Sequence, residues 1–415
     1  MVNVLFVSIS FPPKSDAECL QTAKYFHYLQ HDTELQIEVV TSHVPTLYMN
    51  YDVKLEPYAE GYINQVAVKL KENRWVNLLR NRLKLEESVF PDAKQSFHQQ
   101  SEKVIERIKQ KPDLIYSRSY PLSSAIMAYK LKQHYKVPWI LHLSDPWADA
   151  PLHNWSAAYN AKQREWELKC MEAAQFICLT SLPTIEFYCK KYPHLREKFL
   201  FFPNVYELKQ PPEENFPHLE QLLSSKKLNI VFTGAMAGER SPSYFLEPLS
   251  ELLTVKPEVS SKVNIIFAGE ADYRNRAVFE KYKMSLVHYL GKVSFTEAQY
   301  LQRQARLLLV IDNPIAKPEM AMFFPSKLLD YMVAKKRVLA ITTKGSATDL
   351  VMQDLKGDVF GHANKEQIME AIEQAIAEFE KGNDAYFQSE KVPEKYEAKY
   401  NAGRLAELIK KIVNA

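Results

Sequence analysis

Short, almost uninterrupted apolar runs recur along this chain of 415 residues, and each is followed by a longer segment with helical spacing of its apolar residues. Strands that are apolar at nearly every position have both faces covered, which is typical of a parallel sheet between layers of helices. The clearest predicted strands are 2–8, 114–116, 139–143, 176–180, 230–232, 263–268, 307–311 and 338–341. The alternation of strands and helices predicts an α/β fold.

The pattern restarts once, after a segment rich in proline and glutamate between residues 204 and 227. Such a composition is typical of an exposed connection between domains. We therefore predict two doubly wound, Rossmann-like domains, 1–206 and 207–395, that face each other across a cleft. Ligands of such sheets bind beyond the carboxyl ends of the strands, so we expect the site there.

The last segment, 396–415, is predicted to form a helix. Its apolar residues fall at helical spacing, so one stripe of the helix must be buried. That stripe contains Leu405, Leu408, Ile409 and Val413. We expect this helix to pack back on the N-terminal domain.

The bulk properties exclude several classes of protein. A formal net charge of +3 does not indicate a nucleic-acid partner. The cysteines, at positions 19, 170, 178 and 189, have neither zinc-site nor redox-pair spacing, so we expect reduced thiols. The first residues lack the features of a signal peptide, and no apolar run approaches the roughly 18 residues that span a bilayer. We therefore expect a cytoplasmic protein.

Six segments along the chain have the form of known sequence motifs. They are SISFPPKSD at 8–16, WILHLSDPW at 139–147, FPN at 202–204, VFTGA at 231–235, VHYLGKV at 287–293 and PSKLLDYM at 325–332. Together, in this order, they resemble the family-four group of retaining GT-B glycosyltransferases, and the likeness covers nearly the whole chain.

The resemblance implies a GT-B fold and a hexosyltransferase-like activity. Such an enzyme moves a sugar from a nucleotide donor, UDP- or GDP-linked, to a glycan or lipid-linked acceptor, with retention of the anomeric configuration. The similar enzymes build bacterial surface polysaccharides such as capsule and lipopolysaccharide. We expect no cofactor besides the donor nucleotide and no metal, because the site has its own cations.

Three parts of the sequence depart from the family pattern. Lys14, Ser15 and Asp16 stand where the family usually has two glycines, Met322 and Asp330 stand at the positions of its paired glutamates, and Lys335 or Lys336 stands where it usually has a glycine. Two alternatives therefore stay open. One is a sugar-nucleotide epimerase of the same fold, and the other is an inactive GT-B protein that binds or scaffolds.

Transfer of a glycosyl group leaves negative charge on a nucleotide phosphate, so the donor site needs preorganised hydrogen-bond donors. Arg240, in the turn after a strand, and Lys327, where a helix should begin, suit this task. The resemblance places Asp330 on the ribose hydroxyls, and Gly291 and Val293 beside the base. The predicted donor site contains Ser15, Gly234, Arg240, Gly291, Val293, Ser326, Lys327 and Asp330.

Three polar residues end predicted strands of the first domain, on the acceptor side. Asp145 is predicted to bind the acceptor hydroxyl or take its proton, and His142 to bind the transferring sugar. The structural alternatives are a capping or turn aspartate and a core histidine. Arg118 ends the neighbouring strand. The predicted catalytic residues are thus Asp145, His142, Arg240 and Lys327, and the predicted acceptor-side residues are Arg118 and Asp145.

One further segment, 73–84, reads as a basic amphipathic helix. Its apolar face would hold Trp75, Leu78, Leu79 and Leu83, with Arg74, Arg80, Arg82 and Lys84 around it. Such a helix either packs on the protein or lies on the inner face of an anionic membrane, which would suit a lipid-linked acceptor. The packed helix is slightly favoured.

Overall fold

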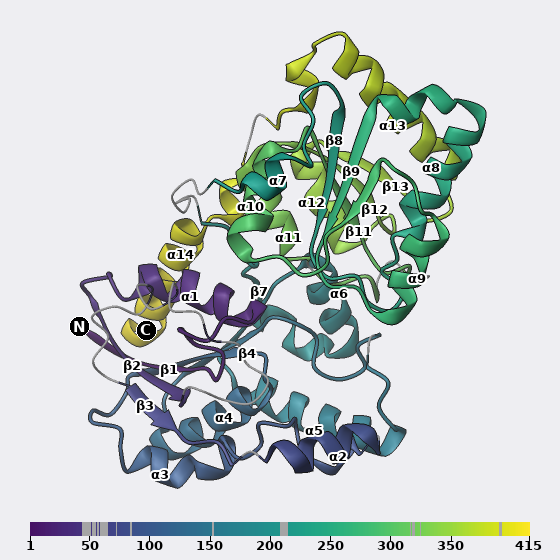
Figure 1. Ribbon diagram of the computed structural model, residues 1–415. Helices are drawn as coiled ribbons and strands as arrows, with labels where there is room; N and C mark the ends of the chain where they lie inside the picture. The colour runs from purple at the N-terminus through teal and green to yellow at the C-terminus, as the bar shows by residue number, and fades with distance from the viewer. Residues whose placement is uncertain are drawn as a thin grey trace. The chain divides into compact units, whose positions relative to one another are not determined.

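The computed structural model describes residues 1–415 except 44–50, 52–54, 56–57, 59–64, 72, 84, 152, 208–214, 316, 318–319, 324 and 390–391. The chain divides into two compact units (Figure 1). Unit 1 contains Met1–Val205 and Lys395–Ala415, and unit 2 contains Tyr206–Glu394. The predicted boundaries, after residues 206 and 395, lie one residue from these.

Unit 1 is built on a sheet of seven parallel strands in the order β3-β2-β1-β4-β5-β6-β7. The strands are β1 Val2–Val7, β2 Leu35–Ser42, β3 Gln65–Val68, β4 Leu114–Ser119, β5 Trp139–Leu143, β6 Phe176–Leu179 and β7 Phe199–Phe201. The chain order reverses between β1 and β4. Sheets of this kind bind ligands at such a switch point, beyond the carboxyl ends of the two strands.

Helices cover both faces of this sheet. They are α1 Ala17–Leu29, α2 Arg74–Arg82, α3 Ser101–Ile105, α4 Ser123–Tyr135, α5 Ala157–Ala173, α6 Leu182–Lys191 and α14 Ala398–Asn414. The C-terminal helix α14 lies beside α1 (Figure 1). Its residues Leu405 and Ile409 are buried in one cluster with Phe26 of α1 and Val4 of β1, so the last helix completes the core of unit 1.

Unit 2 contains six parallel strands in the order β10-β9-β8-β11-β12-β13, and its switch point lies between β8 and β11. The strands are β8 Leu228–Thr233, β9 Val263–Ala268, β10 Val287–Tyr289, β11 Leu307–Ile311, β12 Arg337–Ile341 and β13 Asp358–Phe360. The helices are α7 Pro217–Glu220, α8 Ser243–Val255, α9 Tyr273–Lys281, α10 Phe295–Gln304, α11 Lys327–Ala334, α12 Ala347–Leu355 and α13 Lys365–Glu380.

All the predicted strands are present, and the prediction of two parallel α/β domains is confirmed. The prediction missed β2, β3, β7, β10 and β13. Four of these, β3, β7, β10 and β13, are edge strands of only three or four residues. Such short segments show no periodicity that distinguishes them from loops.

Candidate functional site

Lys327 is the first residue of α11, and its side chain lies over the end of β8. Its Nζ is 3.8 Å from the centroid of the Phe232 ring. The Nζ atom is buried and has no hydrogen-bond partner among the described residues. Burial holds the pKa of Lys327 well below its usual 10.5, and the charge of Arg240 lowers this pKa further, whereas Asp312 opposes the shift. A desolvated cation of this kind is stabilised when an anion reaches it.

Arg240 lies in the connection between β8 and α8. Its Nε is also buried without a hydrogen-bond partner in the described parts of the chain. Its charge acts on Lys327, so the two cations belong to one site. Two cationic side chains with buried nitrogens that lack a hydrogen bond to the described residues, at the switch point of a parallel sheet, form an arrangement that suits a phosphate or diphosphate.

Two glycines let the turns after neighbouring strands pack tightly beneath Lys327. Gly234 has a φ of +118°, and a Cβ there would lie 3.0 Å from both Cε and Nζ of Lys327. Gly269, after β9, has a φ of +151°, and its Cβ would lie 2.0 Å from the carbonyl oxygen of Gly234. The amide of Gly269 in turn donates to the carbonyl of Gly291 at 2.7 Å. Gly269 thus joins two predicted site residues, although the prediction omitted it.

The remaining predicted donor residues differ in their exposure and in the unit to which they belong. Asp330 is half-buried on α11, three residues after Lys327, and Ser326 precedes α11 with an exposed side chain. Val293 is half-buried in the connection between β10 and α10. Ser15 belongs to unit 1, so unit 2 by itself does not bring it to this site.

Asp312, directly after β11, is a site residue that the sequence reading missed. Its carboxylate accepts hydrogen bonds from the hydroxyls of Thr342, at 3.1 Å, and Thr348. Its carbonyl oxygen lies 2.9 Å from Nε2 of His362. These contacts fix the connection after β11 beside Lys327, and the carboxylate favours the charged form of the lysine.

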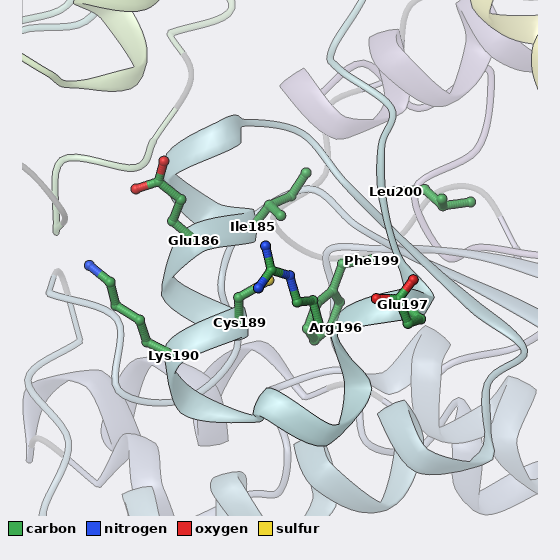
Figure 2. Close-up of a pocket in the computed structure, with 8 residues that line it drawn as sticks. All are labelled: Ile185, Glu186, Cys189, Lys190, Arg196, Glu197, Phe199 and Leu200. Atoms are coloured by element: carbon green, nitrogen blue, oxygen red, sulfur yellow. The ribbon is translucent and has the colours of Figure 1, made fainter.

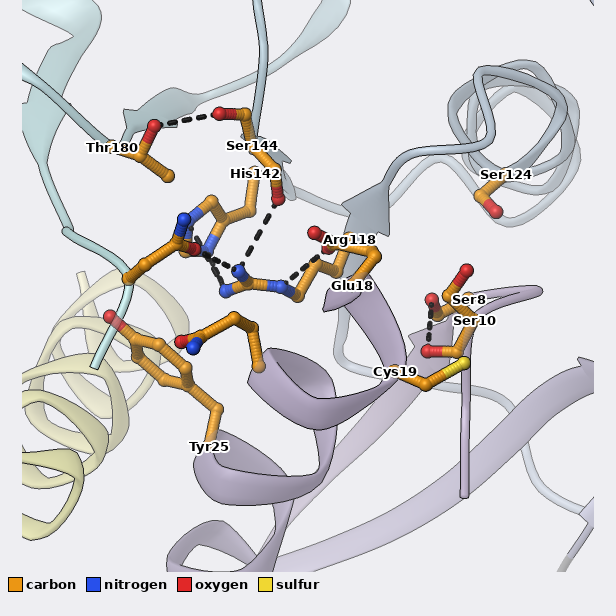
Figure 3. Close-up of polar contacts among 12 residues, drawn as sticks. Ser8, Ser10, Glu18, Cys19, Tyr25, Arg118, Ser124, His142, Ser144 and Thr180 are labelled. Carbon is orange, nitrogen blue, oxygen red and sulfur yellow. Dashed lines mark hydrogen bonds and ion pairs between the residues drawn. The ribbon is translucent and has the colours of Figure 1, made fainter. Parts of the chain in front are cut away.

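In unit 1, Arg118 ends β4 and is fully buried. Figure 3 shows its guanidinium between α1 and the end of β5. Its Nε donates to Oε1 of Glu18 at 2.7 Å, and Nη2 donates to Oδ1 of Asn204 at 2.9 Å and to Oγ of Ser144 at 3.3 Å. Arg118 therefore has a hydrogen-bonded counterion, whereas Nζ of Lys327 has no hydrogen bond to the described residues.

Glu18, at the start of α1, is the counterion that the sequence reading missed. Its side chain is 11% exposed. Burial raises the pKa of Glu18 to about 7, and the positive charge of Arg118 opposes this shift. Because α1 follows β1 and Arg118 ends β4, this ion pair closes the switch point of unit 1.

His142 lies in β5 and is fully buried. Its Nδ1 is 2.8 Å from the hydroxyl of Tyr116. Burial and the charge of Arg118 hold the pKa of His142 well below its usual value, so the imidazole is neutral. The His142 ring is enclosed in the unit next to Arg118. Its predicted contact with a sugar stays a prediction.

Asp145 follows β5 and has an exposed side chain. Its neighbours fix its position. The amide of Ser144 donates to the carbonyl of Ser119 at 2.8 Å, and the hydroxyl of Thr180 donates to the carbonyl of Ser144 at 2.7 Å. Trp147 is fully buried, and its indole donates to Gln163 at 2.7 Å. Asp145 is thus held at the carboxyl edge of unit 1 and is accessible from solvent.

A cavity of about 620 Å³ lies elsewhere in unit 1, between α6 and β7 (Figure 2). Its lining contains Ile185, Glu186, Cys189, Lys190, Arg196, Glu197, Phe199 and Leu200. This lining contains two cationic side chains and two carboxylates, so its formal charges cancel. None of the predicted site residues lines it.

Helix α2 coincides with the predicted amphipathic segment. Trp75, Leu79 and Leu83 are 79%, 56% and 55% exposed, so the favoured reading of a packed helix does not hold for these side chains. The predicted Lys84, and the side chains of Arg74 and Leu78, lie outside the described residues.

Within the described ranges, no group of His, Cys, Asp or Glu side chains has an arrangement that could hold a metal ion. In the same part of the chain, no helix combines the length and the apolar character needed to cross a bilayer.

Comparison with solved structures identifies the fold. The chain matches Anabaena HepE in complex with UDP-glucose, with a TM-score of 0.66 and 14% identity over 99% of this chain and 100% of the other. It matches sucrose-phosphate synthase from Thermosynechococcus elongatus, with a TM-score of 0.64 and 12% identity over 100% of both chains. A proposed UDP-N-acetylglucosamine 2-epimerase from Listeria monocytogenes gives a TM-score of 0.60 and 12% identity, over 99% of this chain and 96% of the other.

No family model matches the chain, and no curated protein matches it significantly. At these identities the likenesses show the fold alone. The chain has the GT-B fold, as the sequence predicted.

Proposed function

We propose that this protein is a glycosyltransferase that moves a sugar from a nucleotide donor, UDP- or GDP-linked, to a glycan or lipid-linked acceptor with retention, in cell-surface polysaccharide assembly. The observation that carries the proposal is that Nζ of Lys327 and Nε of Arg240, at the switch point of unit 2, are buried and have no hydrogen-bond partner among the described residues. HepE, which has the same fold, was solved with UDP-glucose, and this supports a sugar nucleotide as the ligand.

The chemistry follows from where charge develops. The bond between the anomeric carbon and the phosphate oxygen breaks, and its electron pair goes to the nucleotide diphosphate. Lys327 and Arg240 stabilise that charge, and Asp330 binds the ribose. The acceptor hydroxyl forms the new bond to the anomeric carbon, and its proton passes to Asp145 or to the departing phosphate.

The proposal includes independence from metal, because the two cations neutralise the leaving diphosphate. Activity should therefore survive EDTA. Complete loss on chelation, restored by Mg²⁺ or Mn²⁺, would contradict this part of the proposal.

An epimerase is the second candidate, and the likeness to the Listeria protein favours it. An epimerase changes the sugar of the donor without an acceptor. Incubation of the protein with UDP- and GDP-sugars alone, followed by analysis of the sugar product, separates the two functions.

The first test is isothermal titration calorimetry with UDP and GDP, followed by transfer assays with the nucleotide sugars. We expect one of the two diphosphates to bind, and the binding to depend on Lys327. If neither diphosphate binds the folded protein, the proposed donor site is wrong.

The proposal extends to peripheral contact with the inner face of the cytoplasmic membrane through residues 73–84. The exposed Trp75 and Leu79 of α2, together with Arg80 and Arg82, support it. Leu79→Asp should weaken binding to vesicles that contain phosphatidylglycerol. Val255→Asp, at an apolar residue of unit 2 that is 75% exposed, is the matched control.

A further inference from the structure

Tyr331 occupies the opening between the two strands of the switch point in unit 2. Pairing of β8 with β11 consists of Ile230 with Leu307 and Val231 with Leu308, and it goes no further along β8. Beyond this point, the hydroxyl of Tyr331 accepts from the amide of Thr233 at 2.9 Å and donates to the carbonyl of Leu309 at 3.1 Å. The side chain thus takes the place of ladder hydrogen bonds where the strands separate.

The same hydroxyl sits in a fully enclosed network. Tyr331 is 0% exposed. The hydroxyl of Thr233 lies 3.3 Å from the Tyr331 hydroxyl and accepts from Nε2 of Gln302 at 2.8 Å. One tyrosine therefore ties α11 to β8 and β11, and Gln302 joins α10 to the same point.

Tyr331 lies four residues after Lys327, and residues at this spacing share one face of a helix. That face packs on the end of β8, where Nζ of Lys327 lies 3.8 Å from the Phe232 ring. The position of the amine over β8 therefore depends on how firmly α11 is held there.

We propose that Tyr331 is a positioning residue of the anion site. Its hydroxyl holds α11 so that the Lys327 amine stays buried, without a hydrogen bond to the described residues, and ready for a diphosphate. The inference deepens the proposed function and rests on it. Tyr331 itself does not touch the ligand, because its hydroxyl is fully used by Thr233 and Leu309.

The pH dependence of binding reports this positioning. Only the ammonium form of Lys327 attracts a diphosphate, so affinity falls as pH rises through the lowered pKa of that lysine. The charged groups that face it are Arg240, from the connection after β8, and Asp312, after β11, while Asp330 on α11 faces Tyr331. A loosened α11 lets the amine reach water, so its pKa moves back up and the fall in affinity shifts to higher pH.

The test compares Tyr331→Phe with Tyr188→Phe. Tyr188 is a matched control in unit 1, fully buried, whose hydroxyl accepts from the amide of Trp147 at 2.8 Å and donates to Glu167 at 3.0 Å. The measurements are the melting temperature and the Kd for the diphosphate that binds the wild-type protein, UDP or GDP, from pH 7 to 9. The terminal phosphate, with a second pKa of about 6, is mostly ionised in this range, and the control cancels the remaining titration of the ligand.

We expect both variants to melt at lower temperature. Only Tyr331→Phe should weaken nucleotide binding, by roughly tenfold at pH 7, and its loss of affinity with rising pH should lie at higher pH than in the wild type. If Tyr331→Phe has the Kd and pH profile of the wild type, or if Tyr188→Phe changes both equally, the inference is wrong.

The outcomes also separate this inference from the proposed function. If the wild-type protein binds neither diphosphate, both fail together. If it binds one and Lys327→Ala abolishes binding while Tyr331→Phe has no effect, only the positioning role fails. Should Tyr331→Phe not fold, Gln302→Met removes only the outer hydrogen bond to Thr233, and a two- to threefold loss of affinity is expected. Unchanged binding in that variant overturns the inference.

Discussion

The switch points of the two units have the same topology and opposite electrostatics. In unit 1, Arg118 at the end of β4 meets Glu18 at 2.7 Å and Asn204 at 2.9 Å. In unit 2, Nζ of Lys327 and Nε of Arg240 have no hydrogen-bond partner within the described residues. A buried cation that is hydrogen-bonded to a counterion closes its site, whereas buried cationic atoms without a hydrogen bond leave the site open to an anionic ligand.

The largest expected effect tests whether the ion pair of unit 1 is structural. Arg118→Met should leave the buried Glu18 without its counterion and lower the free energy of unfolding by about 3–5 kcal/mol. All five tryptophans of the chain lie in unit 1, so urea unfolding followed by tryptophan fluorescence measures this unit.

The double variant Arg118→Met/Glu18→Gln sharpens this test. It removes both charges and should recover part of the lost stability, because no carboxylate remains buried alone. A single variant as stable as the wild type would show that Arg118 is not held as the structure indicates.

The second largest expected effect is a loss of turnover caused by a substitution in unit 2. Lys327→Ala should slow sugar transfer by on the order of 10²-fold or more, as the loss of a donor to developing charge typically does. Its melting temperature should not fall as it does in the Arg118 variant, because the substitution removes an unpaired, desolvated charge.

A surface lysine provides the control for this variant. Lys365→Ala changes a partly exposed lysine that pairs with Glu247 and Glu251, and should leave turnover unchanged. Wild-type kinetics in Lys327→Ala would remove Lys327 from the donor site.

The third effect separates the roles of the two units in binding. Asp330→Asn should weaken the nucleotide diphosphate by about 1.5–3 kcal/mol, through the loss of a charge-assisted hydrogen bond to the ribose. Asp145→Asn should keep nucleotide affinity and still depress transfer. Calorimetric titration of both variants provides the measurement, and the reverse pattern would show that the site assignments are exchanged.

The sequence predicted the part of this comparison that depends on local pattern. The central strands are nearly continuous apolar runs, and Lys327 and Arg240 could be placed because each lies next to a recognisable turn or helix start. The network of unit 1 could not be predicted, since Glu18 and Arg118 are 100 positions apart. Tyr331 and Thr233 are 98 positions apart. Contacts of this kind follow from which strands become neighbours, and the short edge strands that complete both sheets leave little trace in the sequence.

The smallest effect is the pH dependence of stability in unit 1. Burial raises the pKa of Glu18 from 4.5 to about 7. Between these values the folded protein keeps a proton that the unfolded chain has lost, so stability should fall as pH rises through this window. Glu18→Gln cannot titrate and should flatten the decline, by on the order of 1 kcal/mol between pH 5 and 7.5.

Glu34→Gln is the control for this last test, because the side chain of Glu34 is 68% exposed. It should show the slope of the wild type when unfolding is followed by tryptophan fluorescence. An unchanged slope in Glu18→Gln would mean that Arg118 keeps the carboxylate ionised throughout this range. The contrast between the two switch points would then be stronger, with a permanent ion pair in unit 1 and, in unit 2, buried cationic atoms that lack a hydrogen bond to the described residues.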